Sequence, residues 1–148
     1  NSNPFTPSVN LMFALDEALK MMKEEGLKNI FQKHERHKRA ISEAAKKLNL
    51  KLFANQQSLS PSITSIEAEN FDAESFRKSI QNKYGIQLAG GQDHLKGKIF
   101  RVGHLGYISD RDIISVITAI GLTLYEKNIV NENDIGQALI EAKKHLEE

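Results

Sequence analysis

Strand-like segments are grouped in the middle of this chain, with long segments of helical periodicity on both sides. The two leading helical segments span residues 8–25 and 28–48, a shorter one follows Asp72, and two more follow Ser109 and Asp134. The four expected strands span residues 50–54, 62–68, 86–88 and 98–102. Because helices and strands do not alternate regularly, this order predicts an α+β fold in which helices pack on a small mixed or antiparallel sheet of about four strands.

Capping residues mark several of the expected helix ends. Ser8, Asp72 and Ser109 precede three of the helical segments and carry the short polar side chains that N-caps prefer. Gly26 and Gly85 follow the ends of two of them, where glycine accepts the left-handed backbone of a helix terminus. The chain therefore indicates helix boundaries independently of its hydrophobic pattern.

One arginine interrupts the apolar run of the last expected strand. Arg101 lies among Ile99, Phe100 and Val102, and Gly103 ends the run. A strand that places a guanidinium among apolar residues can present it at the strand end, where its planar set of five donors suits a carboxylate or a phosphate. Spacing alone favours the alternative of a structural arginine on a half-exposed strand.

Composition excludes several classes of protein. The 148 residues suffice for one domain with a real core. The absence of cysteine excludes thiol catalysis and disulfides, so we expect a cytoplasmic location. A formal net charge of +1 argues against a general nucleic-acid binder, and no apolar run approaches the roughly 20 residues of a membrane span.

The basic segment 28–51 is the strongest local charge feature. It holds eight Lys or Arg and two Glu, which gives a local charge of +6. We interpret it as a solvated helix face, because Phe31 is the only Phe, Tyr or Trp in the segment and no series of aromatic side chains is interleaved for base stacking. His34 and His37 are one residue short of the zincin spacing, so no metal site is predicted there. His94 and His104 lack the Ser, Cys or Asp partners of a hydrolase triad, and we expect His104 to orient the loop after Arg101 rather than to perform chemistry.

Several segments, in a fixed order, carry a wider resemblance. They are Asn3–Val9, Leu48–Phe53, Tyr84–Gly91, Leu95–Lys98 and the arginine-bearing strand up to Tyr107. Together they resemble the C-terminal part of the class V family of pyridoxal-phosphate aminotransferases, in the alanine–glyoxylate and serine–pyruvate branch. The resemblance covers residues 3–127, and the tail is similar to cyanobacterial and archaeal members of the soluble hydrogenase small subunit type.

The resemblance implies roles for four residues. In the family, the arginine matching Arg101 binds the α-carboxylate of the amino-acid substrate through two parallel hydrogen bonds. The threonine matching Thr6 hydrogen-bonds the phosphate of pyridoxal 5′-phosphate in the other subunit of a homodimer. Gly90 and Gly91 are expected to shape the active-site wall around the cofactor. The intact enzyme would move an amino group from an L-amino acid such as alanine or serine to a 2-oxo acid such as glyoxylate or pyruvate.

The resemblance also implies that essential parts of the enzyme lie elsewhere. The family's Schiff-base lysine belongs to a larger upstream domain, and none of the lysines here has its sequence context. We therefore expect no catalytic residue in this chain, which also lacks an initial methionine and fits a fragment that is inactive alone. Residues 1–26 would be an extended lead and a bridging helix, and residues 27–148 the small domain.

Two alternatives belong to other classes of protein. The chain could be a non-catalytic α+β module that binds small carboxylates through Arg101 or serves in assembly. It could also bind nucleic acid through residues 28–51, in which case binding would weaken steeply with salt.

Overall fold

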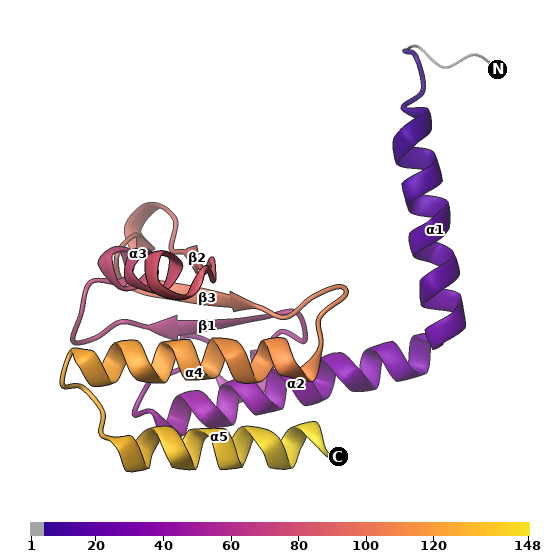
Figure 1. Cartoon of the computed structure of the whole chain (residues 1–148). Helices are drawn as coiled ribbons and strands as arrows, with labels where there is room; N and C mark the ends of the chain where they lie inside the picture. Colours follow the sequence, from indigo (N-terminus) through magenta and orange to yellow (C-terminus); the bar gives the residue numbers. More distant parts are fainter. Residues whose placement is uncertain (1–4) are drawn as a thin grey trace. The chain divides into compact units, whose positions relative to one another are not determined.

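The computed structural model describes residues 5–148, so the start of the Asn3–Val9 segment lies outside the described residues. The helices are α1 (Val9–Glu25), α2 (Leu27–Lys47), α3 (Ala73–Tyr84), α4 (Asp110–Glu126) and α5 (Glu132–Leu146) (Figure 1). The strands are β1 (Ile63–Glu67), β2 (Ala89–Gly90) and β3 (Ile99–Gly103), and two 3-10 turns are η1 (Gln56–Ser58) and η2 (Asp93–Leu95). The chain divides into two compact units, one ending at Lys33 and one beginning at His34.

The unit that ends at Lys33 is helical. None of the residues of α1 is buried, although its apolar side chains recur at helical spacing. Gly26 ends α1 with a φ of 84°, and its N–H donates to the carbonyl of Met22, as the sequence predicts. Ser8 precedes the helix as predicted, but its side chain makes no capping hydrogen bond.

The unit that begins at His34 contains a three-stranded antiparallel sheet in the order β1-β3-β2. This confirms the α+β fold, but the expectation of four strands is wrong by one. Residues 50–54 form only an isolated bridge between Leu52 and Ile66. The pairing stops there because the chain turns away into η1 after Phe53, whose N–H makes the last hydrogen bond to β1.

The expected strand at 86–88 is also displaced, since β2 begins only at Ala89. The Leu88 carbonyl accepts a hydrogen bond from the Arg77 side chain instead of from a neighbouring strand. Leu88 itself is buried and packs with the core. A tertiary contact from α3 therefore decides where the edge strand starts.

The core lies on one face of the sheet. Phe100 of β3 packs with Phe71 and with Phe76 of α3, at ring-centroid distances of 6.3 Å and 5.1 Å. Ile66 of β1 lies with apolar residues of α2 and α4 around a small enclosed space. α5 packs against α4 (Figure 1), where a side chain at Gly121 would come within 3.2 Å of Ile135. Close packing on this face leaves little tolerance for larger side chains.

Reciprocal capping boxes begin the last two helices. The Ser109 hydroxyl accepts a hydrogen bond from the Asp112 N–H, and the Asp112 carboxylate accepts one from the Ser109 N–H. Asn131 and Asp134 form the same arrangement at α5. The predicted N-cap at Ser109 is confirmed, whereas Asp134 is the third residue of α5 rather than its start.

A cluster of three histidines anchors the segment that follows β3. His104 is fully buried and its Nε2 lies 3.0 Å from the Thr64 hydroxyl of β1. From α2, His34 Nδ1 donates to the His104 carbonyl and His37 Nε2 donates to the Asp110 carboxylate at 2.8 Å. These contacts hold the segment between β3 and α4 against α2 and β1. These contacts agree with the prediction that His104 orients the loop after Arg101 rather than performs chemistry.

Removing the α4 cap should destabilise the fold. We expect Ser109→Ala to lower the free energy of unfolding by about 1 kcal/mol, because the Asp112 N–H loses the hydroxyl that caps it. Urea denaturation of this chain measures the change. Ser115→Ala is the matched control, since Ser115 lies on the exposed side of the same helix and bonds only the Arg111 carbonyl. A loss in the control as large as in Ser109→Ala would contradict the capping argument.

The buried histidine predicts a loss of stability in acid. Burial lowers the pKa of His104 from 6.5 to about 4, and the nearby His37 and His34 act in the same direction. The folded state therefore binds this proton less tightly than the unfolded state. Its contribution is fully present above pH 6.5, is lost as the pH falls toward 4, and amounts to about 3 kcal/mol.

The measurement is the free energy of unfolding at several pH values between 7 and 4. We expect His104→Gln, which does not titrate, to reduce the slope over this range. His94→Gln should keep the slope, because His94 is exposed in η2. An unchanged slope in His104→Gln would contradict the assignment to this residue.

Candidate functional site

Arg101 lies in the middle of β3, the central strand, on the face opposite the core. Its neighbours Phe100 and Val102 are buried, at 0 % and 2 % exposure, and point into the core. Because side chains alternate along a strand, Arg101 points to the other face, where it is half-buried. The sequence had suggested a guanidinium at the strand end; the structure places it at the strand centre, in a row across the sheet with its paired residues Ser65 and Ala89.

The Arg101 side chain is held by the backbone rather than by an acidic group. Its Nε donates a hydrogen bond to the Gly90 carbonyl at 2.9 Å. Among residues 5–148, no carboxylate forms an ion pair with it. With Nε occupied, the two terminal nitrogens keep their donors, in the parallel geometry that matches the two oxygens of a carboxylate. The site can therefore bind a small anion end-on.

Gly90 and Gly91 are required by close approach within the chain. A Cβ at Gly91 would lie 2.0 Å from the Leu95 carbonyl oxygen, so no side chain fits there. A Cβ at Gly90 would lie 2.5 Å from Arg77 Nη1 and 2.6 Å from Glu74 Oε1. The two glycines let β2 and the following turn pack tightly beside Arg101.

Thr6 lies in the other unit, in the extended lead before α1. Thr6 and its neighbour Pro7 are both exposed. The hydroxyl is thus accessible, and the structure does not bring it together with Arg101 within one unit.

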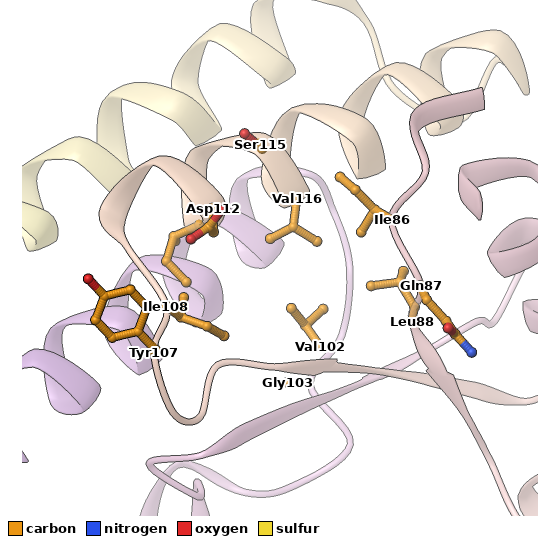
Figure 2. Close-up of a pocket in the computed structure, with 11 residues that line it drawn as sticks. Ile86, Gln87, Leu88, Val102, Gly103, Tyr107, Ile108, Asp112, Ser115 and Val116 are labelled. Atoms are coloured by element: carbon orange, nitrogen blue, oxygen red, sulfur yellow. The ribbon is translucent and has the colours of Figure 1, made fainter. Parts of the chain in front are cut away.

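A cavity of about 400 Å³ lies on the face of the sheet toward which Val102 points (Figure 2). Arg101 is not among the residues that line it. Its walls are mostly apolar and come from β3, from α4 and from the segments before β2 and α4, including Val102, Ile86 and Val116. Asp112 at its rim is engaged in the α4 cap, which lowers the pKa of its carboxyl through the Ser109 N–H and hydroxyl. The cavity offers no group arranged for chemistry.

The basic segment is largely neutralised by acidic partners. Five of its eight cations form ion pairs with glutamates: Lys33, Lys38, Arg39, Lys46 and Lys51. This supports the interpretation as a solvated, paired helix face. Within the described residues, no cluster of three or more side chains suited to a metal ion occurs, and no helix is long and apolar enough to cross a membrane.

One pair of residues at this site is not apparent from the sequence. Arg77 and Glu74, on consecutive turns of α3, contact the edge strand that supports Arg101. Their i,i+3 spacing is a recognisable helix ion pair. Nothing in the sequence, however, shows that it faces a strand.

Comparisons with known proteins agree with this geometry. No family model matches the chain. The chain is 51% identical over 133 residues to the soluble hydrogenase 42 kDa subunit of Anabaena cylindrica, covering 90% of the chain and 35% of that protein. It is 40% identical over 124 residues to an aminotransferase of Methanocaldococcus jannaschii, covering 83% of the chain and 32% of that protein.

A solved structure extends the comparison to the fold. Pyridoxamine-pyruvate aminotransferase from Mesorhizobium loti superposes with a TM-score of 0.91 at 25% identity, over 99% of this chain and 38% of that one. The chain thus spans about a third of the length of the relatives it matches. By sequence and by fold, it belongs to the class V aminotransferase family and corresponds to the C-terminal small domain of those enzymes.

Proposed function

We propose that this chain is the C-terminal part of a pyridoxal-phosphate-dependent aminotransferase. The whole enzyme moves an amino group from an L-amino acid, alanine or serine, to a 2-oxo acid, glyoxylate or pyruvate. It works in the cytoplasm as a homodimer. Residues 1–26 form the lead and bridging helix from the larger domain, and residues 27–148 form the small domain.

The observation that carries this proposal is the set of contacts that the Arg101 guanidinium makes. Its Nε is fixed by the Gly90 carbonyl, and no acidic side chain of the described residues neutralises it. Both substrates of a transamination carry a carboxylate next to the reacting carbon. A guanidinium anchored at Nε and free at its terminal nitrogens holds that carboxylate in one orientation and so positions the reacting carbon.

The chain's other contributions are positioning ones. Pyridoxal phosphate, when bound, supplies the electron sink for moving the amino group. The exposed hydroxyl of Thr6 has the donor chemistry that a phosphate oxygen in the partner subunit needs. Gly90 and Gly91 let the wall next to Arg101 approach closely, and Gly90 supplies the carbonyl that anchors it.

Replacing the Arg101 guanidinium by an ammonium should selectively weaken carboxylate recognition. In the full-length enzyme that contains this chain, we expect Arg101→Lys to lower kcat/KM for L-alanine by roughly 10- to 100-fold, because one charge-assisted hydrogen bond of the pair is lost. The preference for L-alanine over ethylamine, which lacks the carboxylate, should fall with it. Arg39→Lys is the control, since Arg39 is exposed and paired with Glu35. An unchanged preference would overturn the role of Arg101.

The chain by itself should be inactive. We expect no transamination of L-alanine with glyoxylate when pyridoxal phosphate is added, since the resemblance implies that the reactive lysine lies outside these residues. Mass spectrometry after borohydride treatment should show no stoichiometric adduct at a single lysine. Such an adduct would contradict the proposal. Full-length protein without transaminase activity would instead favour a non-catalytic carboxylate-binding module.

A further inference from the structure

The edge strand that holds Arg101 has little support from the sheet. β2 contains only Ala89 and Gly90 and pairs on one side only, with β3. An isolated two-residue edge pairing is weak. Yet its Gly90 carbonyl is the group that orients the Arg101 guanidinium. Another contact must therefore determine where that carbonyl lies.

Arg77 of α3 supplies this contact. Its Nε donates to the Leu88 carbonyl at 2.7 Å, directly before β2. Its Nη1 lies 2.8 Å from each carboxylate oxygen of Glu74, one turn earlier on the same helix. The Arg77 side chain is only 23% exposed. A half-buried, charge-assisted arrangement of this kind is stronger and more rigid than a surface ion pair.

The ion pair between Arg77 and Glu74 also packs against β2 at Gly90. The space beside the Gly90 Cα is filled by Arg77 Nη1 and Glu74 Oε1. β2 is thus fixed at two points, by the hydrogen bond to Leu88 and by this contact at Gly90. On its other side, the Gly90 carbonyl accepts the hydrogen bond from Arg101.

We propose that Arg77, held by Glu74, is a positioning residue for the substrate carboxylate, acting through Gly90 on the orientation of Arg101. This proposal rests on the proposed function of Arg101. In this role Arg77 acts through its bond to the Leu88 carbonyl and its contact at Gly90, not through a bond to the substrate. It sets the plane of the guanidinium, which decides whether both terminal nitrogens meet the two carboxylate oxygens together.

The first test uses the chain alone and does not require enzyme activity. The chain has five arginines, so the Nε–H signals can be resolved by ¹⁵N NMR. We expect Arg77→Gln to speed hydrogen exchange at Arg101 Nε–H by roughly tenfold, while the Phe100 amide stays protected. Arg39→Gln is the control, because it removes an exposed ion pair far from β2 in sequence. Unchanged exchange at Arg101 would overturn the proposal.

A milder variant covers the case in which Arg77→Gln does not fold. Glu74→Gln leaves the Arg77 bond to Leu88 in place and removes only the carboxylate that holds Nη1. We expect exchange at Arg101 Nε–H to rise by a smaller factor, about threefold. The same signal remaining as slow as in the unmodified chain would count against the proposal.

The second test uses the full-length enzyme and distinguishes the role of Arg77 from the role of Arg101. We expect Arg77→Gln to raise KM for L-alanine roughly tenfold with a smaller change in kcat, and to lower the preference for L-alanine over ethylamine. In the double variant with Arg101→Lys, Arg77→Gln should add no further loss, because the fork that it orients is already gone. A purely structural role would instead lower kcat and stability in both backgrounds.

The outcomes distinguish the two failures. If Arg101→Lys has no effect on carboxylate preference, the proposed function of Arg101 fails. If Arg101→Lys has its effect but Arg77→Gln does not, or if the two losses simply add, the role of Arg77 fails.

Discussion

The position of Arg101 depends on the alternation of side chains along β3 between the two faces of the sheet. Phe100 and Val102 enter the core, and this commits Arg101 to the opposite face of the sheet. A shift of one residue in the register with β1 would exchange the faces. It would bury a guanidinium among phenylalanines, at a cost of several kcal/mol. The packing of Phe100 with Phe71 and Phe76 therefore fixes the side on which a ligand can meet the arginine.

Arg101 is supported from the neighbouring edge strand and from the segment that follows β3. Toward the edge, α3 holds β2 through Arg77, and β2 holds Arg101 through the Gly90 carbonyl. After β3, the buried His104 and its contacts with Thr64 and His34 fix the chain before it enters α4. Catalytic geometry requires this kind of preorganisation, since a side chain on a short strand gains precision only from what surrounds it.

The two units differ in how much of their apolar surface they bury. The unit that begins at His34 has a continuous core of its own. α1 buries none of its residues, although large apolar side chains such as Leu15 and Leu19 are 59% and 54% exposed. Exposed apolar stripes of this size are typical of surfaces that meet another part of a protein.

Local signals in the sequence determined the α+β class, the caps at Asp72 and Ser109, the helix ends at Gly26 and Gly85, and the choice of Arg101 as the residue of interest. These features depend on backbone conformation and hydrophobic periodicity, which neighbouring residues specify. The family also followed from the order of short motifs.

What only the tertiary structure decided are the contacts between segments distant along the chain. Residues 50–54 form only a bridge instead of the expected strand. β2 begins at Ala89 rather than at residue 86, because the Leu88 carbonyl accepts a hydrogen bond from Arg77. The tertiary structure also supplied the partners of the buried His104, namely Thr64 and His34, and it left Arg101 without an acidic partner among the described residues. No periodicity in the sequence encodes such pairings, because they arise only when the helices pack on the sheet.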